Sequence, residues 1–470
     1  MRRGPKPKKT SAPCPSFVQR LTKVGRPAGT VLAPSDAVCV LGSLLAWWLA
    51  CAWAWDFTVD DALISLRYAH NLARGLGYRF NPSGAVSDGV TPLPWPWLLV
   101  PLARVWSGFA LLAASKALGV IAGTLSLVMC AMYMIREEAP RWPLWLLPAC
   151  FPLVAWSVSG METALVMLLA TAAVTVRGRG AAWCAGAAAA LRPELAPWAL
   201  SLVVSFEIAR GRVDVWRMIA VSAPIALVIT VRALCFGRVV PLSVLAKPSD
   251  LRHGLLYCVA AALAAGLPWL VGARWRRGRW PVALAMVVHA LVLIAVGGDW
   301  MPYARLWVPV LPGLITLIDG AAVRSAIVAA VSALCALGIG WRAAPAGVHV
   351  GAERAQIAAA LQLTPPVAAL DVGFVAVAAG DGEVVDLGGL TDAEIAVLPG
   401  GQTSKRVDLA MLEQRGVRTL VVWGEDEDVG TPARVVERRL LRDPRFNAKY
   451  MLSQTLTLGG APLRVWRLRE

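Results

Sequence analysis

Two adjacent carboxylates, Asp60 and Asp61, follow directly on the first long apolar run of the chain, residues 37–55. Carboxylates are costly beside a lipid bilayer, and proteins usually keep them there for chemistry or for handling ions. A carboxylate can accept the proton of an attacking hydroxyl group, which typically contributes about 10²–10⁴-fold to a rate. Two acids at a helix start can also serve only as a cap and as partners of the helix dipole. Of these two interpretations we favour the general base.

Several cationic residues, far apart in the sequence, could bind a phosphate group. Arginine suits this role because its guanidinium group donates two parallel hydrogen bonds to one phosphate. Arg305 closely follows a Gly-Gly-Asp-Trp sequence, although an arginine that extends its charge to the membrane surface is an alternative interpretation. The candidate phosphate ligands are Arg67, Arg192, Lys247 and Arg305.

Two glutamates stand at the ends of apolar runs. Glu162 begins an apolar helix, where a partnership with the helix dipole explains it as well as a site role does. Glu194 follows Arg192 and Pro193 between two short half-helices. A broken backbone of this kind lines a cavity rather than lipid. Both glutamates are therefore candidate site residues.

Asp299 and Trp300 complete the candidate site residues. Carboxylate oxygens are preferred ligands of divalent cations, so any metal would be held by Asp60, Asp61 and Asp299. The sequence requires no cofactor and leaves divalent-cation use open. The four histidines show no zinc-ligand spacing.

The composition places these residues in a membrane protein. Hydrophobic residues make up 57% of the 470 residues and charged residues only 16%. Residues 1–341 hold 14 acids against 31 Lys and Arg, whereas the last 129 residues hold 16 acids against 15. The basic excess thus lies in the N-terminal tail and short loops, as the positive-inside rule requires, and not on a nucleic-acid-binding surface. The nine cysteines imply neither a disulfide framework nor a zinc site.

Three regions follow from this pattern. Residues 1–36 are basic and proline-rich and predict a disordered cytoplasmic tail. Residues 37–341 predict a transmembrane domain of roughly nine to eleven helical segments, with an external loop at 56–94. The proline-rich stretch 92–108 is the segment least suited to cross fully. Residues 342–470 alternate short apolar runs with turns, which predicts an extracytoplasmic α/β domain.

The segment after Asp61 has the period of a helix. Polar residues separated by seven, four and three positions predict one polar face, formed by Asp60, Arg67, Asn71 and Arg74. Apolar residues occupy the other face: Ala62, Leu66, Ala69 and Ala73. We expect an amphipathic helix that lies on the membrane surface and holds acids and cations on one side.

Basic loops orient the chain. Residues 209–217, 273–280 and Arg324 should face the cytoplasm. Residues 192–194, the loop 239–250, the segment 297–305 and the C-terminal domain should then lie outside. The active site is therefore expected on the extracytoplasmic face.

Six motifs in order carry a resemblance to a known family. They are DDALISLRYAHNLARGLGYRFNPSG, GVTPLPW, SGMETAL, ALRPE, GGDWMPYARLWVPVLP and VVDLGGLTDAEIA, which span residues 60–396. Together they resemble the GT-C clan of membrane glycosyltransferases, and in particular the mycobacterial-type terminal arabinofuranosyltransferases. The motif GVTPLPW has an extra proline and no tyrosine compared with that family, which leaves the identity of the sugar open.

The resemblance implies a GT-C-like helical bundle in the bacterial inner (plasma) membrane. It implies an inverting enzyme that moves a monosaccharide from a polyprenyl-phosphate donor to a hydroxyl of a cell-envelope glycan or lipid. A carboxylate of the first external loop would be the base, so that Asp60 or Asp61 fills this role. Membrane lipids and the two substrates are the partners expected.

Two other function classes compete with this one. A lipid or sugar transporter or flippase would also use broken helices and intramembrane acids, but the two halves of the apolar region show no self-similarity. A non-catalytic envelope scaffold would leave the adjacent acids and the ordered motifs unexplained.

Overall fold

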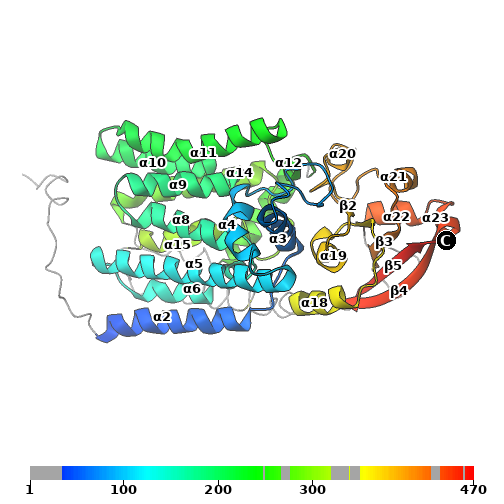
Figure 1. Ribbon diagram of the computed structural model, residues 1–470. Coiled ribbons are helices and arrows are strands. Elements are labelled where there is room, and N and C mark those ends of the chain that lie inside the picture. The colour runs from blue at the N-terminus through cyan, green and yellow to red at the C-terminus, as the bar shows by residue number, and fades with distance from the viewer. Residues whose placement is uncertain are drawn as a thin grey trace, which may run out of the picture.

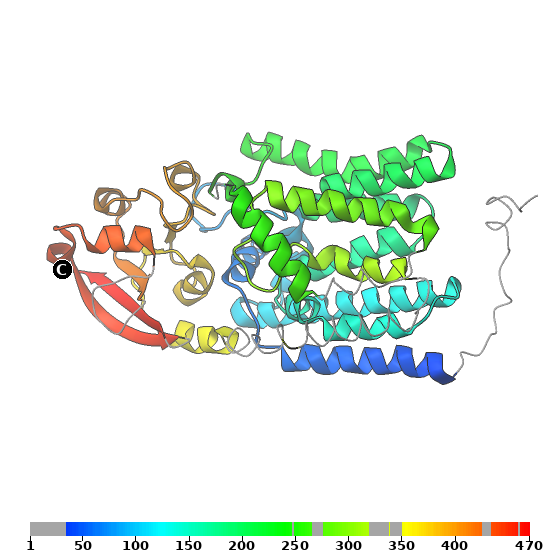
Figure 2. The same ribbon diagram turned by 180° about the vertical axis from the view of Figure 1, so that it is seen from behind.

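The chain has a helical part up to residue 318 and an α/β part from residue 350 onward (Figure 1). The computed structural model describes residues 34–246, 249–265, 276–318, 338, 350–424, 434–458 and 461–470. Most of the predicted N-terminal tail, and all but residue 338 of the apolar stretch 323–341 of the predicted transmembrane domain, lie outside the described residues. Figure 2 shows the same two parts from behind, with the first helix in blue along one border and the C-terminal strands in red at the far end.

The helical part consists of long helices joined by short, broken ones. Its α-helices are α2 (Pro34–Trp53), α3 (Asp60–Ala73), α4 (Pro94–Ala103), α5 (Gly108–Arg136), α6 (Leu146–Ala149), α7 (Phe151–Ser157), α8 (Thr163–Thr175), α9 (Arg179–Leu191), α10 (Ala196–Arg210), α11 (Val215–Phe236), α12 (Leu242–Ala246), α13 (Leu251–Ala264), α14 (Trp280–Ala295) and α15 (Leu311–Leu314). Single 3₁₀ turns connect several of them: η1 (Trp142–Trp145), η2 (Pro193–Leu195), η4 (Arg277–Arg279), η5 (Val308–Val310) and η6 (Ile315–Leu317).

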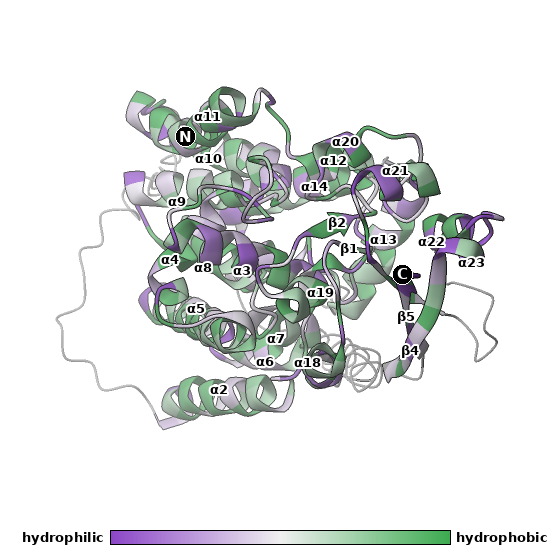
Figure 3. Ribbon diagram, turned by 45° about the vertical axis from the view of Figure 1, so that its right-hand side comes forward, coloured by the Kyte–Doolittle hydropathy of each residue, from purple (hydrophilic) through white to green (hydrophobic). Residues whose placement is uncertain are grey.

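Three of the described helices, α2, α5 and α11, are long and apolar enough to cross a membrane. Their lengths of 20, 29 and 22 residues match a hydrocarbon core about 30 Å thick. Hydrophobic colouring prevails along α2, whereas hydrophilic colouring is frequent at the α/β end of the molecule (Figure 3). These helices suggest that the protein associates with a membrane.

Arg192 and Pro193 divide the apolar run at 181–208 into α9 and α10, as the sequence predicts. Proline disfavours a helical conformation in the residue before it, so α9 ends at Leu191. The small residues of α9 let it pack closely on α11: a Cβ atom on Gly186 would lie 2.2 Å from the carbonyl oxygen of Val221. Pro193 thus sets the end of α9, and the close contact with α11 holds the helix in place.

The segment between α2 and α5 stays at one end of the helical part. The carbonyl of Asp56, just after α2, lies against Gly351 of the α/β part, and Gly108, which begins α5, lies beside Val377. Helix α4 has ten residues, or roughly 15 Å, which is too short to cross. The stretch 92–108, predicted to be the least suited to cross a membrane fully, thus holds only this short helix before α5 begins.

The α/β part contains a five-stranded sheet, which confirms the predicted small C-terminal sheet. The strands are β1 (Val367–Ala369), β2 (Val384–Asp386), β3 (Thr419–Trp423), β4 (Tyr450–Leu458) and β5 (Ala461–Leu468), in the order β2-β1-β3-β5-β4. Strands β2, β1 and β3 are parallel, whereas β5 is antiparallel to both β3 and β4. The helices are α18 (Val350–Ala360), α19 (Val372–Ala379), α20 (Ala393–Ala396), α21 (Leu409–Gln414), α22 (Val435–Leu441) and α23 (Phe446–Lys449).

Helix α3 is present as predicted, but the polar face that was expected to lie on the membrane surface is largely covered by other segments of the chain. It lies between the helical part and α19 (Figure 1). Asp60 is 7% exposed and Asn71 is 1% exposed, so most of the polar face is covered. The covering is tolerated because backbone groups of the α/β part and of the loop after α3 pair with these polar side chains.

Candidate functional site

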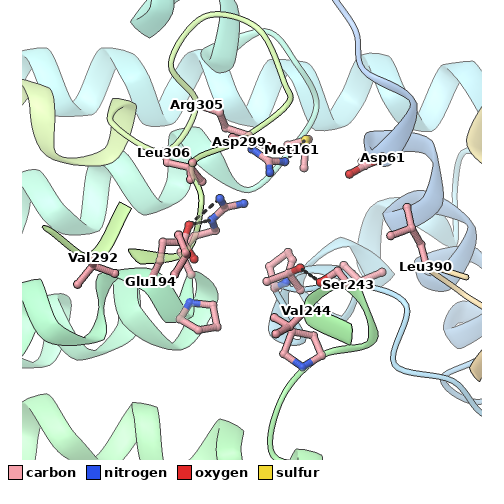
Figure 4. Close-up of a pocket in the computed structure, with 18 of the residues that line it drawn as sticks. Asp61, Met161, Glu194, Ser243, Val244, Val292, Asp299, Arg305, Leu306 and Leu390 are labelled. Atoms are coloured by element: carbon pink, nitrogen blue, oxygen red, sulfur yellow. Dashed lines mark hydrogen bonds and ion pairs between the residues drawn. The ribbon is translucent and has the colours of Figure 1, made fainter. Parts of the chain in front are cut away.

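A cavity of about 670 Å³ lies where α3, α12, α14 and the break between α9 and α10 meet the α/β part. We term it the domain-side cavity. Its charged lining residues are Asp61, Arg192, Glu194, Asp299 and Arg305, and its apolar lining includes Ile64, Val244, Val292, Ala295, Val296, Leu306 and Leu390. Figure 4 shows Asp61 on one wall, with Asp299 and Arg305 on the opposite wall.

Asp61 presents an unpartnered carboxylate to this cavity. Its side chain is half-buried, and it points from α3 toward the hollow (Figure 4). Within the described residues it makes no hydrogen bond and no ion pair. A carboxylate in this position has all its acceptor sites available for a ligand.

Asp60 faces the other way. Its carboxylate accepts hydrogen bonds from the backbone N–H groups of Gly373, at 2.7 Å, and Phe374, at 2.8 Å, in the first turn of α19. Burial, and then the negative charge of Asp371, raise the pKa of Asp60 to about 7, although Arg354 and the two hydrogen bonds oppose the shift. Asp60 thus joins α3 to the α/β part and lies outside the cavity lining.

Arg305 and Asp299 form a fixed pair on the wall opposite Asp61. The Nε atom of Arg305 donates to Oδ2 of Asp299 at 2.6 Å, and Arg305 lies 5.7 Å from the Trp156 ring centroid. The turn before Arg305 is unusual, because Tyr303 and Ala304 have φ angles of 58° and 52°. The indole N–H of Trp156 donates to the carbonyl of Tyr303 at 2.9 Å and holds this turn.

Arg192 is enclosed by two glutamates. Its Nη1 atom lies 2.9 Å from Glu162, and its Nε atom lies 2.6 Å from Glu194. The side chain of Glu162 is completely buried, and that of Arg192 is 6% exposed. Of the two interpretations of Glu162, the ion pair is the contact observed, since its side chain makes no capping hydrogen bond at the start of α8. The arginine thus bridges two carboxylates at the cavity wall, and the three side chains together carry one negative charge in excess.

Other predicted site residues lie elsewhere. Arg67 donates to the carbonyls of Phe80, Ala376, Gly380 and Gly382, and is not part of the cavity lining. Its guanidinium nitrogens are thus used to join α3 to the α/β part.

Lys247 lies outside the described residues. The predicted metal ligands do not converge, because Asp60 binds the start of α19 and Asp299 binds Arg305. In the described ranges, no group of three or more His, Cys, Asp or Glu side chains is arranged to hold a metal ion.

A buried ion pair that was not among the predicted site residues positions the loop before α4. Nε of Arg232, in α11, donates to Asp88 at 2.6 Å, and Nη2 donates to the carbonyl of Thr91 at 2.9 Å. Thr91 in turn lies 2.7 Å from the hydroxyl of Ser243 in the cavity lining. An arginine inside an apolar helix was the available signal, since such residues almost always pair.

A second cavity, of about 360 Å³, adjoins the first. The two share Val296, Gly298 and Asp299. We term the second one the adjoining cavity; its further polar and aromatic lining is His253, Trp300, Asp371, Gln402, Thr403 and Arg434. Trp300 is 55% exposed, and the α/β part supplies the opposite wall.

The residues of the two cavities come from segments spread between positions 61 and 434. Asp61, Arg192, Glu194, Asp299 and Arg305, which the sequence analysis selected, line one hollow together. Comparison of the chain with protein-family models, curated proteins and solved structures gives no match.

Proposed function

We propose that this protein is a polytopic, GT-C-like membrane glycosyltransferase. It would move a monosaccharide, with inversion, from a polyprenyl-phosphate donor to a hydroxyl of a cell-envelope glycan or lipid. The observation that supports the proposal most strongly is the unpartnered carboxylate of Asp61, which faces Arg305 across the domain-side cavity (Figure 4). This arrangement offers a proton acceptor and a cation on opposite walls of one hollow.

Asp61 is the proposed base. The acceptor hydroxyl oxygen forms a bond with the anomeric carbon while the bond from that carbon to the phosphate oxygen breaks. The hydroxyl proton passes to Asp61, and the bonding electrons leave with the lipid phosphate. A carboxylate of ordinary basicity is sufficient, because bond breaking runs ahead of proton loss at an oxocarbenium-like centre.

Arg305 is the proposed phosphate ligand. Asp299 fixes its Nε atom, which leaves the two terminal nitrogens, of which one lies 4.0 Å from the sulfur of Met161. A guanidinium group held in this way can donate two hydrogen bonds to a phosphate. The negative charge that develops on the departing phosphate would then be stabilised by a cation already in position.

The apolar lining supports a lipid-linked donor. Val292, Ala295 and Val296 at the end of α14 line the cavity together with Leu306 and Arg305. These side chains would contact the first isoprene units next to the phosphate. Burial of such groups contributes about 0.8 kcal/mol for each CH₂.

The adjoining cavity is the proposed acceptor route. It shares Gly298 and Asp299 with the domain-side cavity, and its exposed Trp300 offers a large apolar face with a polar edge. Gln402 and Thr403 supply donors and acceptors for hydroxyl groups. An acceptor sugar held there would direct a hydroxyl toward Asp61.

The proposed location is the bacterial inner membrane, with the site and the α/β part on the extracytoplasmic side. The three long apolar helices support membrane residence. The basic loops 209–217 and 273–280 support this orientation by the positive-inside rule.

The test is a transfer assay with purified protein, a radiolabelled polyprenyl-phosphate monosaccharide and isolated envelope glycan. Asp61→Asn should lower transfer by about 10²–10⁴-fold and leave folding unchanged. Asp56→Asn is the matched control, because Asp56 is exposed and lies outside the cavity lining. It should retain normal transfer.

Full transfer by the Asp61→Asn variant would refute the assigned base. If the protein moved a labelled lipid across vesicle membranes but transferred no sugar, the glycosyltransferase assignment would be refuted and a flippase would be favoured. Mass spectrometry of envelope glycans from a strain that lacks the gene should show a missing sugar residue, which would identify both the sugar and the acceptor.

A further inference from the structure

A third cavity, of about 620 Å³, lies among helix ends remote from the α/β part. It is lined where α5, α8 and α10 end and where α9 and α11 begin. We term it the arginine cavity; its charged lining is Arg136, Glu137, Arg177, Glu207, Arg210, Arg217, Arg276 and Arg279. Helix α9 starts at this cavity and ends beside Arg192, so its 13 residues separate the two sites by roughly 20 Å.

The arginine cavity carries more positive than negative charge. Six arginines and two glutamates line it. Glu207 is shared by Arg210 and Arg217, each at 2.7 Å. Glu137 is likewise shared, and its contact with Arg177 is 2.7 Å. Because one carboxylate neutralises one cation, a positive surplus remains among the described lining residues.

Some of these arginines have structural roles. Arg136 donates to the carbonyl of Thr175 at 2.7 Å, and Arg279 donates to that of Val174 at 3.0 Å. Both carbonyls belong to the last turn of α8, where cations stabilise a helix end. These two arginines are therefore poor choices for a functional test.

Arg177 and Arg210 are better placed for a ligand. Their side chains are 69% and 35% exposed. Among the described residues, each makes a hydrogen bond to one carboxylate oxygen. Their remaining nitrogens can donate to an additional anion without breaking the contacts that hold the helix ends.

The rest of the lining is apolar. It includes Ala173, Val174, Ala181, Ala182, Leu202, Val203 and Phe206, from α8, α9 and α10. Nearby outer surfaces are apolar as well, since Ile208, Val215 and Trp216 are more than 60% exposed. A tryptophan at a helix end is typical of the membrane–water interface. An anion that fits both the cations and this wall has an apolar chain attached.

We propose that the arginine cavity binds the phosphate headgroup of an anionic membrane lipid. Arg177 and Arg210 would hold the phosphate, and the wall formed by α8, α9 and α10 would contact the first carbons of the acyl chains. The proposal does not depend on glycosyl transfer. Arginines that serve only to orient the chain would be interchangeable and would bind no ligand.

The test measures binding to the full chain in neutral detergent by isothermal titration. The probes are dioctanoyl phosphatidic acid, inorganic phosphate, and dioctanoylglycerol, which has the same chains without the phosphate. Phosphatidic acid should bind at least about tenfold more tightly than either of the other two, because only it offers charge and chains together. Phosphate binding as tight as that of the lipid would overturn the lipid assignment.

A double variant and a matched double control test whether the two arginines bind the lipid phosphate. Arg177→Gln with Arg210→Gln should weaken phosphatidic acid binding by at least about tenfold, since two charge-assisted hydrogen bonds are lost. The matched control is Arg104→Gln with Arg212→Gln, which removes two exposed arginines outside the cavity lining. An equal loss in both pairs would overturn the proposal.

The Ala181→Phe variant tests the proposed lipid site without changing any charge. The larger side chain narrows the cavity at its apolar wall and leaves every arginine in place. It should weaken phosphatidic acid binding by at least about threefold through steric exclusion. Unchanged lipid affinity in this variant would contradict the proposed position of the acyl chains, even if the double arginine variant failed to fold.

Discussion

The two ends of the helical part hold cavities of similar volume, about 670 and 620 Å³, with different charge arrangements. In the domain-side cavity each arginine has carboxylates of its own, as Arg305 has Asp299 and Arg192 has two glutamates. In the arginine cavity, several arginines share one glutamate. The group left unpartnered is thus a carboxylate, Asp61, at one end and guanidinium nitrogens at the other.

This difference bears on what each end can do. Buried pairs fix side chains in one geometry, which suits a site where a reaction must be aligned. A half-exposed surplus of cations attracts an anion and needs no such alignment.

Removal of one arginine should have different consequences at the two ends. Arg192→Gln should lower the free energy of unfolding by about 3–5 kcal/mol, because it leaves the fully buried Glu162 without its cation. Arg210→Gln should change it by about 0–1 kcal/mol, since Glu207 keeps Arg217. Thermal unfolding in detergent measures the stability of both variants. Equal losses of stability would contradict the proposed difference between the two cavities.

Asp299→Asn should weaken the donor-binding function without removing the base. It loses the charge that fixes Arg305, so kcat/KM for the donor should fall by at least about tenfold, because both donor binding and stabilisation of the departing phosphate are weakened. Steady-state kinetics over a range of donor concentrations separates kcat from KM. A loss confined to kcat would show that Asp299 acts only in the chemical step.

Asp60 should make the free energy of unfolding depend on pH. The Asp61→Asn variant should show the same pH dependence as the wild type. Burial raises the pKa of Asp60 from 3.8 to about 7, so between these values the folded chain keeps a proton that the unfolded chain has released. Its contribution to stability is full below about pH 4 and declines as the pH rises to about 7. Each pKa unit corresponds to about 1.4 kcal/mol.

The measurement compares unfolding of the wild type, Asp60→Asn and Asp61→Asn at pH 4.5 and 7.5. Asp60→Asn should lose at least about 1 kcal/mol of this pH dependence, and Asp61→Asn should retain it. The same pH dependence in all three proteins would show that Asp60 does not titrate in this range.

The smallest effect is expected at the exposed ion pair between Arg74 and Asp381. Their side chains are 40% and 64% exposed. Arg74→Gln should therefore change the free energy of unfolding by less than about 1 kcal/mol. A double-mutant cycle with Asp381→Asn measures the pair, and a coupling above that size would show that it contributes to holding the two parts together.

Much of the architecture could be predicted from local patterns. The break at Arg192 and Pro193, the helix after Asp60 and the α/β alternation near the C-terminus follow from proline, from helical period and from short apolar runs. Asp299 and Arg305 could be selected together because they lie in one short segment. Such features depend on residues that are neighbours in the sequence.

Other features depend on contacts between distant segments. The period of α3 indicated a polar face but not what covers it, and α19, some 310 residues later, supplies the partners of Asp60. Arg67 was predicted to be a phosphate ligand, but its guanidinium group donates hydrogen bonds to backbone carbonyls of the α/β part. Arg232 and Asp88 are 144 positions apart, and neither carries a local signal that names the other.

The apolar class of the chain, its helix breaks and the set of residues able to do chemistry could all be predicted from the amino-acid sequence, because they depend on residue type and spacing. The different surroundings of the two adjacent acids follow only from the packing of distant segments. Successive residues of a helix point about 100° apart, so Asp60 meets the N–H groups of α19 while Asp61 faces the hollow. Which direction is buried and which is open depends on the elements that pack around α3.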